Sequence, residues 1–353
     1  MPKGYDPLDL VFNSLKSPAE LDGVQILTGR NNLKKLFSVC CGSRRFHDFR
    51  LDARVIPGSR LVMLSRWELP AALRGREPQS WHLAFHEQNT LRLFEGSDRT
   101  PGYHRILRYN FGGLLMMVKC DVSAAVPWDG CNPNDGDGTR ASVAGKTDEG
   151  DDTGEEEDKC RSRGDWKIDQ DDLDDLMSLD SFSFYRDPGT NDAVFSGPPR
   201  RLSSGVNMVP TPFPHPPQGH LISLKTRQTY PGAPRGIRHL SQADAAFSMV
   251  FFGQIGNVYL AHHWDGEFET QMLEYRLGEG TLADMERGHA GTIRKVRDVL
   301  KWIYDSTLEH GSVGVVFSGG QVRCFAKRDA DVDGALSEES WEVIRQSGIQ
   351  SVV

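Results

Sequence analysis

Hydrophobic and polar positions form two patterned parts of the chain. In the first, "RNNLKKLFSVC" (30–40) carries its apolar residues on one helical face, which predicts a helix that Asn31 or Asn32 can cap. The stretches "RLDARVI" and "RLVMLSRWE" flank "PGS" and predict a β-hairpin. "GLLMMVKCDV" (113–122) is apolar almost throughout, which is typical of a strand buried on both faces.

The second part begins at residue 220 and contains mostly strand patterns. The stretches "HLISLKTRQ", "AAFSMVFF", "NVYLAHHW" and "FETQMLEYRL" each predict a strand. "TLADMERGHAGTIRKVRDVLKWIYDSTLEHG" predicts the longest helix, with Ile293 and Leu300 on one face and Gly311 at its end. A hairpin, "VGVVFSGGQVRCFA", and a short helix capped by Ser337, "SEESWEVIRQ", follow.

Residues 127–219 differ from both parts because Pro, Gly, Ser and acidic residues dominate them. Eight acidic side chains lie in "DEGDDTGEEED" alone. Such a stretch buries too little apolar surface to offset its ordering entropy, so we predict a long disordered acidic insert. Residues 20–126 and 220–346 are then two halves of one α/β domain, with a central mixed sheet and flanking helices.

Composition and charge restrict the class of protein. The chain has 353 residues, of which 38% are hydrophobic and 25% are charged. Its net charge of -8 argues against a protein that binds nucleic acid or membranes over most of its surface, but it allows a local basic groove. We expect no signal peptide and no membrane span. The six cysteines form no C-x-x-C pair, which indicates free thiols in a reducing compartment, the cytoplasm or the nucleus.

Two motifs that suggest phosphate chemistry are better explained as insert sequence. "AGKT" (144–147) ends like a phosphate-binding P-loop, but Arg140 stands where the first glycine should be and no strand precedes it. "DDLDD" (171–175) fits the aspartate pattern of prenyl-diphosphate synthases, but that chemistry needs a large helical bundle, whereas this chain has mostly strand patterns.

Two further motifs suggest metal binding. "DADVDG" (329–334) begins like an EF-hand calcium loop, but Ser340 occupies the position of the bidentate glutamate, so an acidic helix-capping turn is favoured over weak calcium binding. His262 and His263 are neighbours on a predicted strand and point to opposite faces. We therefore expect one of them to be buried and the other exposed.

The strand at 221–228 holds the most informative side chains. Because side chains alternate along a strand, Ser223 and Lys225 share one face while Ile222 and Leu224 share the other. A lysine two residues after the position of a metal-binding acid is typical of one large class of nucleases. An ordinary α/β protein with a strand that ends in Lys-Thr-Arg is the alternative interpretation.

Several stretches resemble a set of fungal proteins that often carry the label geranylgeranyl diphosphate synthase, which their sequences do not support. The stretches are "RNNLKKL", "FRLDARV", "YHRILRYNFGGL" and "LKTR". Through that set the chain resembles the decapping-exoribonuclease-like branch of the PD-(D/E)xK nuclease superfamily. The resemblance implies a nuclease-like core whose carboxylates hold Mg²⁺ or Mn²⁺ against the scissile phosphate, with a lysine beside the metal.

Carried over residue by residue, that pattern is only partly present. Glu87 in "WHLAFHEQ" stands for the first acid, and Asp121 stands where a glutamate is expected. Ser123 and Ser223 occupy two further acid positions, whereas Lys225 is retained. Serine is a neutral, weak ligand for a hard cation, so Glu87 and Asp121 would hold a metal only weakly.

Three functions follow from this comparison. The leading interpretation is a degenerate, catalytically impaired nuclease-like protein that binds RNA or a protein partner, with Lys225, Arg227 and the region of His104, Arg105 and Arg108 as the contact surface. The second is an active metal-dependent RNA 5′-end or phosphodiester hydrolase that works through Glu87, Asp121 and Lys225. The third is a protein–protein scaffold that binds through its acidic insert.

Overall fold

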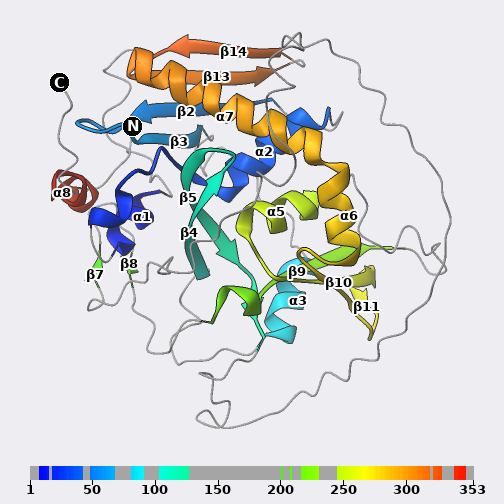
Figure 1. Ribbon diagram of the computed structural model, residues 1–353. Coiled ribbons are helices and arrows are strands. Elements are labelled where there is room, and N and C mark those ends of the chain that lie inside the picture. The colour runs from blue at the N-terminus through cyan, green and yellow to red at the C-terminus, as the bar shows by residue number, and fades with distance from the viewer. Residues whose placement is uncertain are drawn as a thin grey trace.

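The computed structural model describes a two-sheet α/β fold (Figure 1). The described residues are 8–15, 18–42, 48–67, 81–90, 103–126, 200–201, 207–208, 216–229, 245–318, 321–327 and 338–346. The motifs "AGKT", "DDLDD" and "DADVDG", the cap at Ser337 and nearly all of the predicted insert lie outside them.

The larger sheet has seven strands in the order β14-β13-β2-β3-β1-β5-β4. β1 pairs in parallel with β3 and β5, and the other pairs are antiparallel, so the sheet is mixed as predicted. Its strands are β1 (Ile26–Gly29), β2 (Phe49–Val55), β3 (Val62–Trp67), β4 (Tyr103–Phe111), β5 (Leu114–Val122), β13 (Ser312–Ser318) and β14 (Gln321–Ala326).

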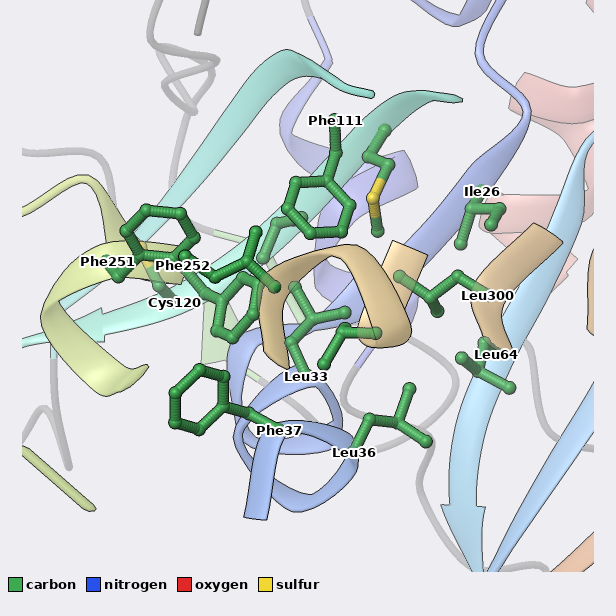
Figure 2. Close-up of a cluster of buried hydrophobic side chains, with 14 of the residues drawn as sticks. Ile26, Leu33, Leu36, Phe37, Leu64, Phe111, Cys120, Phe251, Phe252 and Leu300 are labelled. Carbon is green, nitrogen blue, oxygen red and sulfur yellow. The ribbon is translucent and has the colours of Figure 1, made fainter. Parts of the chain in front are cut away.

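Helices cover both faces of the larger sheet (Figure 1). On one face lie α2 (Arg30–Cys40), α5 (Ala245–Gly253), α6 (Gly280–Gly288) and α7 (Ala290–His310), and their apolar side chains form the main core. Figure 2 shows this core, where Leu33, Phe37 and Phe252 meet side chains from the strands. On the other face, α1 (Asp9–Ser14), α8 (Glu338–Gln346) and the short helix η1 (Pro18–Leu21) surround a smaller cluster.

The second sheet has the order β11-β10-β9-β6, and β12 also pairs with β10. Its strands are β6 (Ala124–Ala125), β9 (Leu221–Gln228), β10 (Asn257–Trp264), β11 (Glu267–Phe268) and β12 (Leu273–Arg276). The helix α3 (Trp81–Asn89) packs against one face through Phe85, and the main core below α5 covers the other. β6 follows β5 after a single residue, so the end of β5 lies at the junction of the two sheets.

Most predicted elements are confirmed. β2 and β3 form the hairpin around Pro57 and Gly58, β13 and β14 form the second hairpin, and Gly311 ends α7 with a positive φ of 74°. The predicted long helix is divided into α6 and α7, because His289 interrupts it.

Three local predictions are wrong. "AAFSMVFF" is the helix α5, not a strand; its apolar residues are buried on all sides, and a short apolar run fits either element. The N-cap of α2 is Gly29, while Asn32 donates hydrogen bonds to the hydroxyl of Thr28 and the carbonyl of Leu64. His262 and His263 are both buried, because α3 and the core cover the two faces of β10.

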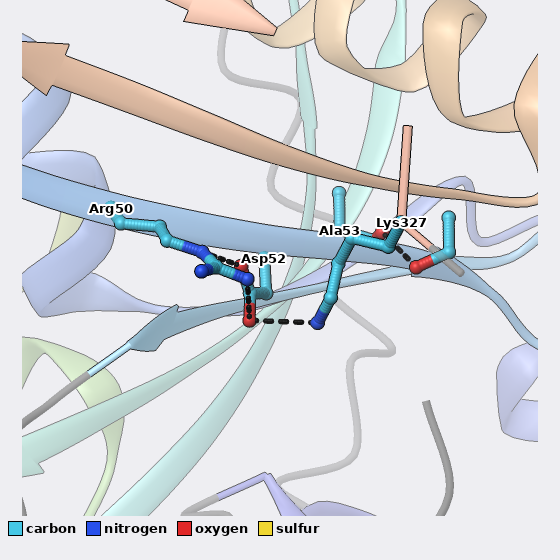
Figure 3. A network of polar contacts seen from close by, with 5 residues as sticks. Arg50, Asp52, Ala53 and Lys327 are labelled. Carbon is cyan, nitrogen blue, oxygen red and sulfur yellow. Dashed lines mark hydrogen bonds and ion pairs between the residues drawn. The ribbon is translucent and has the colours of Figure 1, made fainter. Parts of the chain in front are cut away.

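Two short strands and a short helix precede β9 in the chain. Within residues 127–219, β7 (Arg200–Arg201) pairs with β8 (Asn207–Met208), and the short helix η6 (Gln218–His220) leads into β9. Within the larger sheet, Asp52 of β2 accepts hydrogen bonds from both Arg50 and Lys327 (Figure 3). Within the described residues, no helix is long and apolar enough to cross a membrane.

Candidate functional site

The strand β9 directs Lys225 toward the main core, as its alternation predicts. The parallel register with β10 sets Ser223 beside Val258 and Lys225 beside Leu260, and both β10 residues belong to the core below α5. Ile222 and Leu224 point the other way and pack with Phe85 of α3. The prediction that Ser223 and Lys225 share one face is therefore confirmed.

Lys225 meets a second lysine at the helix α5. Its Nζ contacts the sulfur of Met249 at 3.7 Å, and Nζ of Lys34 contacts the same sulfur at 3.6 Å. Burial lowers the pKa of Lys225 to about 8, with smaller contributions from the charges of Arg30 and Lys34. Burial and neighbouring cations also lower the pKa of Lys34. Two partly buried ammonium groups are thus held close together.

Arg30 is the buried centre of this group of cations. It is the first residue of α2, lies one helical turn before Lys34, and is only 4% exposed. Its side chain runs along Gly253 of α5, where a Cβ atom would lie 3.1 Å from the Arg30 Cδ. Among the described residues, its Nε has no hydrogen-bond partner. A guanidinium group is always charged, and the carboxylate whose pKa responds to this charge is that of Asp121.

Lys119 and Asp121 lie on β5 next to Arg30. The register of β1 and β5 sets Lys119 beside Gly29, the residue before Arg30. Asp121 is half-exposed, and its Oδ1 lies 2.6 Å from Nδ1 of His104 and 3.7 Å from Nζ of Lys119. The hydrogen bond from His104 lowers the pKa of Asp121 to about 2. The charges of Lys119 and Arg30 act in the same direction, whereas burial opposes them. Its carboxylate therefore already has two side-chain partners, His104 and Lys119.

We call Arg30, Lys34, Lys119 and Lys225 the cation cluster. The charge of Arg30 acts on the pKa of each of the other three, which places them within electrostatic reach of one point. The groups that shift the pKa of Asp121 include Arg30 and Lys119 but not Lys225. Asp121 is therefore coupled to the cluster through Arg30 and Lys119.

Glu87 lies on α3, the helix that packs against the Ile222 and Leu224 face of β9. It is exposed on α3, while the residues of that helix that face β9 are His82, Phe85 and His86. Nδ1 of His82 lies 3.5 Å from the hydroxyl of Thr226 on β9. Burial lowers the pKa of His82 to about 4, with contributions from His86 and Lys225, so His82 is neutral at physiological pH.

Of the two serines at the expected acid positions, Ser223 lies on β9 and Ser123 lies between β5 and β6. β6 and β9 are antiparallel, and Ala124 pairs with Ile222. Ser123 precedes Ala124 and Ser223 follows Ile222, so the two serines are next to each other in this register. Ser223 is only 2% exposed, whereas Ser123 is half-buried between β5 and β6. The structure thus brings Ser223 and Lys225 together on one strand face and places Ser123 near them. Convergence of all five predicted residues stays a prediction.

These side chains fit a divalent metal ion poorly. A hard cation needs several charged oxygens, but Ser123 and Ser223 offer neutral hydroxyls and Asp121 is paired with His104. In the part of the chain that the structure describes, no three His, Cys, Asp or Glu side chains gather in a way that could hold a metal. The cation cluster would also repel a metal ion placed beside Lys225.

The predicted contact surface needs one correction. Arg105 is 2% exposed, and its guanidinium donates hydrogen bonds to the side chain of Gln218 and the carbonyl of Pro216. It therefore fixes the approach to β9 rather than facing a ligand. Arg108 donates to the carbonyl of Asp22 at 2.7 Å, and His104 is engaged with Asp121.

Sequence reasoning missed three of the four cations in the cluster. Arg30, Lys34 and Lys119 lie on two elements that are separate from β9 in the sequence. One signal was available: Arg30 stands three residues before Leu33 and seven before Phe37, on the buried stripe of α2. A charged residue on an apolar stripe is unusual and marks a candidate site.

Comparisons with known proteins match this fold. The family description that fits residues 2–151 is DUF8563, a domain of unknown function. Among solved structures, Rai1 of Scheffersomyces stipitis in complex with (3'-NADP)+ and calcium ion is 9% identical over 97% of this chain and 81% of its own, with a TM-score of 0.52. A second structure of that protein gives 8% identity over the same shares and a TM-score of 0.51.

Rai1 of S. pombe in complex with 3'-FADP is 14% identical over 86% of this chain and 72% of its own, with a TM-score of 0.49. No curated protein matches the sequence. The two S. stipitis structures support the resemblance to the decapping-exoribonuclease-like branch at the level of the fold. The chain therefore has a nuclease-like α/β fold similar to that of Rai1.

Proposed function

We propose that the protein is a degenerate PD-(D/E)xK nuclease-like protein that binds RNA without hydrolysing it. The observation that carries this proposal is the cation cluster, which lies where the resemblance calls for metal-binding carboxylates. Lys225 keeps its place on β9, but the serine before it is neutral and the nearest charged groups are Arg30 and Lys34. Such a site attracts phosphate and lacks the ligands that metal-assisted hydrolysis needs.

Exposed aromatic residues support RNA as the partner. Trp264 is 49% exposed and lies four residues after Leu260 on β10, so the two side chains alternate onto the same side of that strand. Leu260 is the β10 residue that pairs with Lys225 of β9. Four residues of extended strand span about 13 Å, which is the separation of Trp264 from Leu260 along β10. Trp81 is also about half exposed, and its ring packs on Gly266 in the turn that follows Trp264. Aromatic rings beside a basic groove are a common platform for single-stranded RNA.

Two alternatives follow from the same residues. An active hydrolase would use Mg²⁺ or Mn²⁺ at Glu87 and Asp121, with Lys225 beside the metal. The calcium ion in the S. stipitis Rai1 complex is consistent with metal binding by a protein of this fold. A scaffold would bind a protein partner through the acidic stretch of residues 127–219. The cation cluster favours RNA binding over both. A fungal source and a location in the cytoplasm or nucleus stay predictions.

The test is to incubate the purified full chain with 5′-monophosphorylated RNA in Mg²⁺ or Mn²⁺ and to measure both cleavage and binding. We expect binding whose affinity falls as salt rises, because cationic contacts release counterions, and no cleavage above that of the buffer. Metal-dependent cleavage that Asp121→Asn abolishes would favour the hydrolase. The absence of RNA binding at low salt would favour the scaffold.

A further inference from the structure

A cysteine and a histidine meet where α2 ends and α7 begins. Cys41 is the C-cap of α2, and His289 is the residue between α6 and α7. The Sγ atom of Cys41 lies 3.9 Å from Nδ1 of His289 and 3.7 Å from Oγ1 of Thr292. All three residues are half-buried. Arg30 of the cation cluster is at the opposite end of α2, about 16 Å away along the helix, so this is a separate group of side chains.

The imidazole of His289 is held in place from two sides. The ring of Phe37 meets it edge-on with ring centres 5.1 Å apart, and the ring of Phe247 stacks on it at 5.3 Å. The backbone N–H of His289 donates to the carbonyl of Met285 in α6, and its carbonyl accepts from the N–H of Ile293 in α7. A base that is fixed beside a thiol is the arrangement that activates a cysteine as a nucleophile.

The other thiols lack such a base. Burial raises the pKa of Cys40 to about 12, and the charges of Lys295 and Asp298 act on it in opposite directions, so Cys40 stays protonated at physiological pH. Burial also raises the pKa of Cys324, which is exposed on β14. Of the four cysteines that the structure describes, none forms a disulfide, and Cys41 is the one with an imidazole within hydrogen-bond reach.

We propose that Cys41 is a site of S-thiolation, at which a small disulfide reacts with the thiol and His289 moves the proton. Nδ1 of His289 takes the proton of the Cys41 thiol. The thiolate attacks one sulfur of the disulfide RS–SR, so that the Cys41 S–SR bond forms as the old S–S bond breaks. The leaving RS⁻ takes the proton from the imidazolium and departs as RSH. The step needs no other reactant and is independent of RNA binding.

A small external disulfide fits this thiol better than an internal one. Cys40 and Cys41 are consecutive residues with helical backbone angles at the end of α2, and consecutive helical side chains point about 100° apart. A disulfide needs Cβ atoms about 3.8 Å apart, so the two thiols cannot join unless the end of α2 unwinds. The first residues of α7, a helix of 21 residues, also favour a negatively charged sulfur beside them.

The experiment is incubation of the full chain with oxidised glutathione at pH 7, followed by mass spectrometry of its tryptic peptides over time. Cys40→Ser assigns the signal, because Cys40 and Cys41 fall on one peptide. An ordinary thiol is only about 3% ionised at pH 7, so a neighbouring base has a large effect. We expect Cys41 to be modified at least about fivefold faster than Cys324, although Cys324 is the more exposed thiol.

His289→Phe tests the base itself. The new ring can occupy the space between Phe37 and Phe247 but has no nitrogen to take a proton. We expect the rate at Cys41 to fall about fivefold while the rate at Cys324 stays the same. If this variant does not fold, His289→Gln and the comparison of the two thiols in the wild type carry the test.

The matched control is His310→Phe, which removes an exposed histidine from the other end of α7. It should leave the rates at both Cys41 and Cys324 unchanged. The proposal is overturned if Cys41 reacts no faster than Cys324 in the folded wild type. It is also overturned if a folded His289→Phe variant keeps the wild-type rate at Cys41, because the thiol would then react without the imidazole.

Discussion

Lys34 and Lys225 direct their ammonium groups at the same atom, the sulfur of Met249, from a helix and a strand that are far apart in the sequence. Like charges repel, so the fold holds them together against their electrostatic preference. Strain of this kind is expected at functional sites, where a ligand supplies the missing charge. It gives the protein properties that can be measured without knowing the ligand.

The first prediction concerns pH and stability. The pKa of Lys225 is about 8 in the folded protein and 10.5 for an unperturbed lysine. Between these values the unfolded chain binds a proton that the folded protein does not, so unfolding takes up a proton and the free energy of unfolding rises with pH. We therefore expect the charge of Lys225 to destabilise the protein fully below about pH 8. This destabilisation should decrease as the pH rises from about 8 to 10.5.

The matched variant is Lys225→Met, because other groups also titrate in this range. Burial raises the pKa of Cys40 to about 12 and that of Cys120 to about 11, and these thiols lower stability as pH rises. The free energy of unfolding in urea is measured for both proteins at each pH, and the value for Lys225→Met is subtracted from that of the wild type. The difference no longer contains the contribution of these thiols. The wild type should gain stability relative to the variant from pH 7.5 to 10. A constant difference would contradict the assigned position of Lys225.

The neighbours of Lys225 leave this sign unchanged. Arg30 and Lys34 from α2 are cations and act in the same direction, and Met249 from α5 is neutral. From α3, His82 and His86 have lowered pKa values and are neutral throughout this pH range. Phosphate should reverse the effect, because an anion favours the charged lysine.

The second prediction tests the position of Arg30 without removing its charge. In Gly253→Ala, the new methyl group would lie 3.1 Å from Cδ and 3.3 Å from Nη1 of Arg30. The guanidinium must move by a few tenths of an ångström, so affinity for 5′-phosphorylated RNA should fall several-fold. The free energy of unfolding should change by about 1 kcal/mol or less, because helix propensity offsets the contact.

Gly291→Ala is the control for that variant. It also replaces a helical glycine, near the start of α7, but a Cβ atom there would meet nothing within 4 Å. It should leave RNA affinity unchanged and stabilise the protein by up to about 1 kcal/mol. Equal effects of the two variants on RNA affinity would argue against a role for Arg30 in binding.

Much of the fold follows from the sequence because local patterns determine it. The alternation of Ile222 and Leu224 with Ser223 and Lys225 gives the two faces of β9, and Gly311 has the positive φ that ends α7. The helix α5 was predicted as a strand because its eight residues AAFSMVFF, seven of them apolar, carry no period. Only the tertiary position of α5, between α2 and the two sheets, decides that it is a helix.

The candidate site was less predictable for a related reason. Lys225 was found through its strand pattern, but its partners Arg30 and Lys119 are adjacent to it only after the sheets have formed. Glu87 was chosen from a motif, yet its position on α3 turns it to solvent. Sequence motifs report residue types, whereas the balance of charge at a site depends on which elements pack together.

The third prediction concerns the aromatic residues beside β9. Trp264→Ala should weaken binding of oligouridylate by about 1–3 kcal/mol, the usual effect of losing one stacked base. Trp302→Ala is the control, since Trp302 is 42% exposed on α7, which covers the larger sheet rather than the second one. Fluorescence titration of each variant measures the difference. Similar affinities of both variants and the wild type would exclude Trp264 from the RNA surface.

The last prediction restores the acids that the resemblance calls for. Ser123→Asp and Ser223→Glu together would place two carboxylates beside Asp121 and Lys225. We expect Mn²⁺ affinity, measured by isothermal titration, to rise in the double variant, because charged oxygens replace neutral hydroxyls. Two clustered carboxylates also repel each other, which should raise the pKa of at least one of them until the metal binds.

The structure adds two consequences to that experiment. Ser223 is 2% exposed, so the larger glutamate should cost about 1–3 kcal/mol through overpacking, and Ser223→Gln controls for its size. The new carboxylate would also neutralise Lys225, so Ser223→Glu alone should weaken RNA binding relative to Ser223→Gln. Unchanged Mn²⁺ affinity in a folded double variant would count against a degenerate metal site. Equal RNA affinity of Ser223→Glu and Ser223→Gln would instead show that RNA binds away from Lys225.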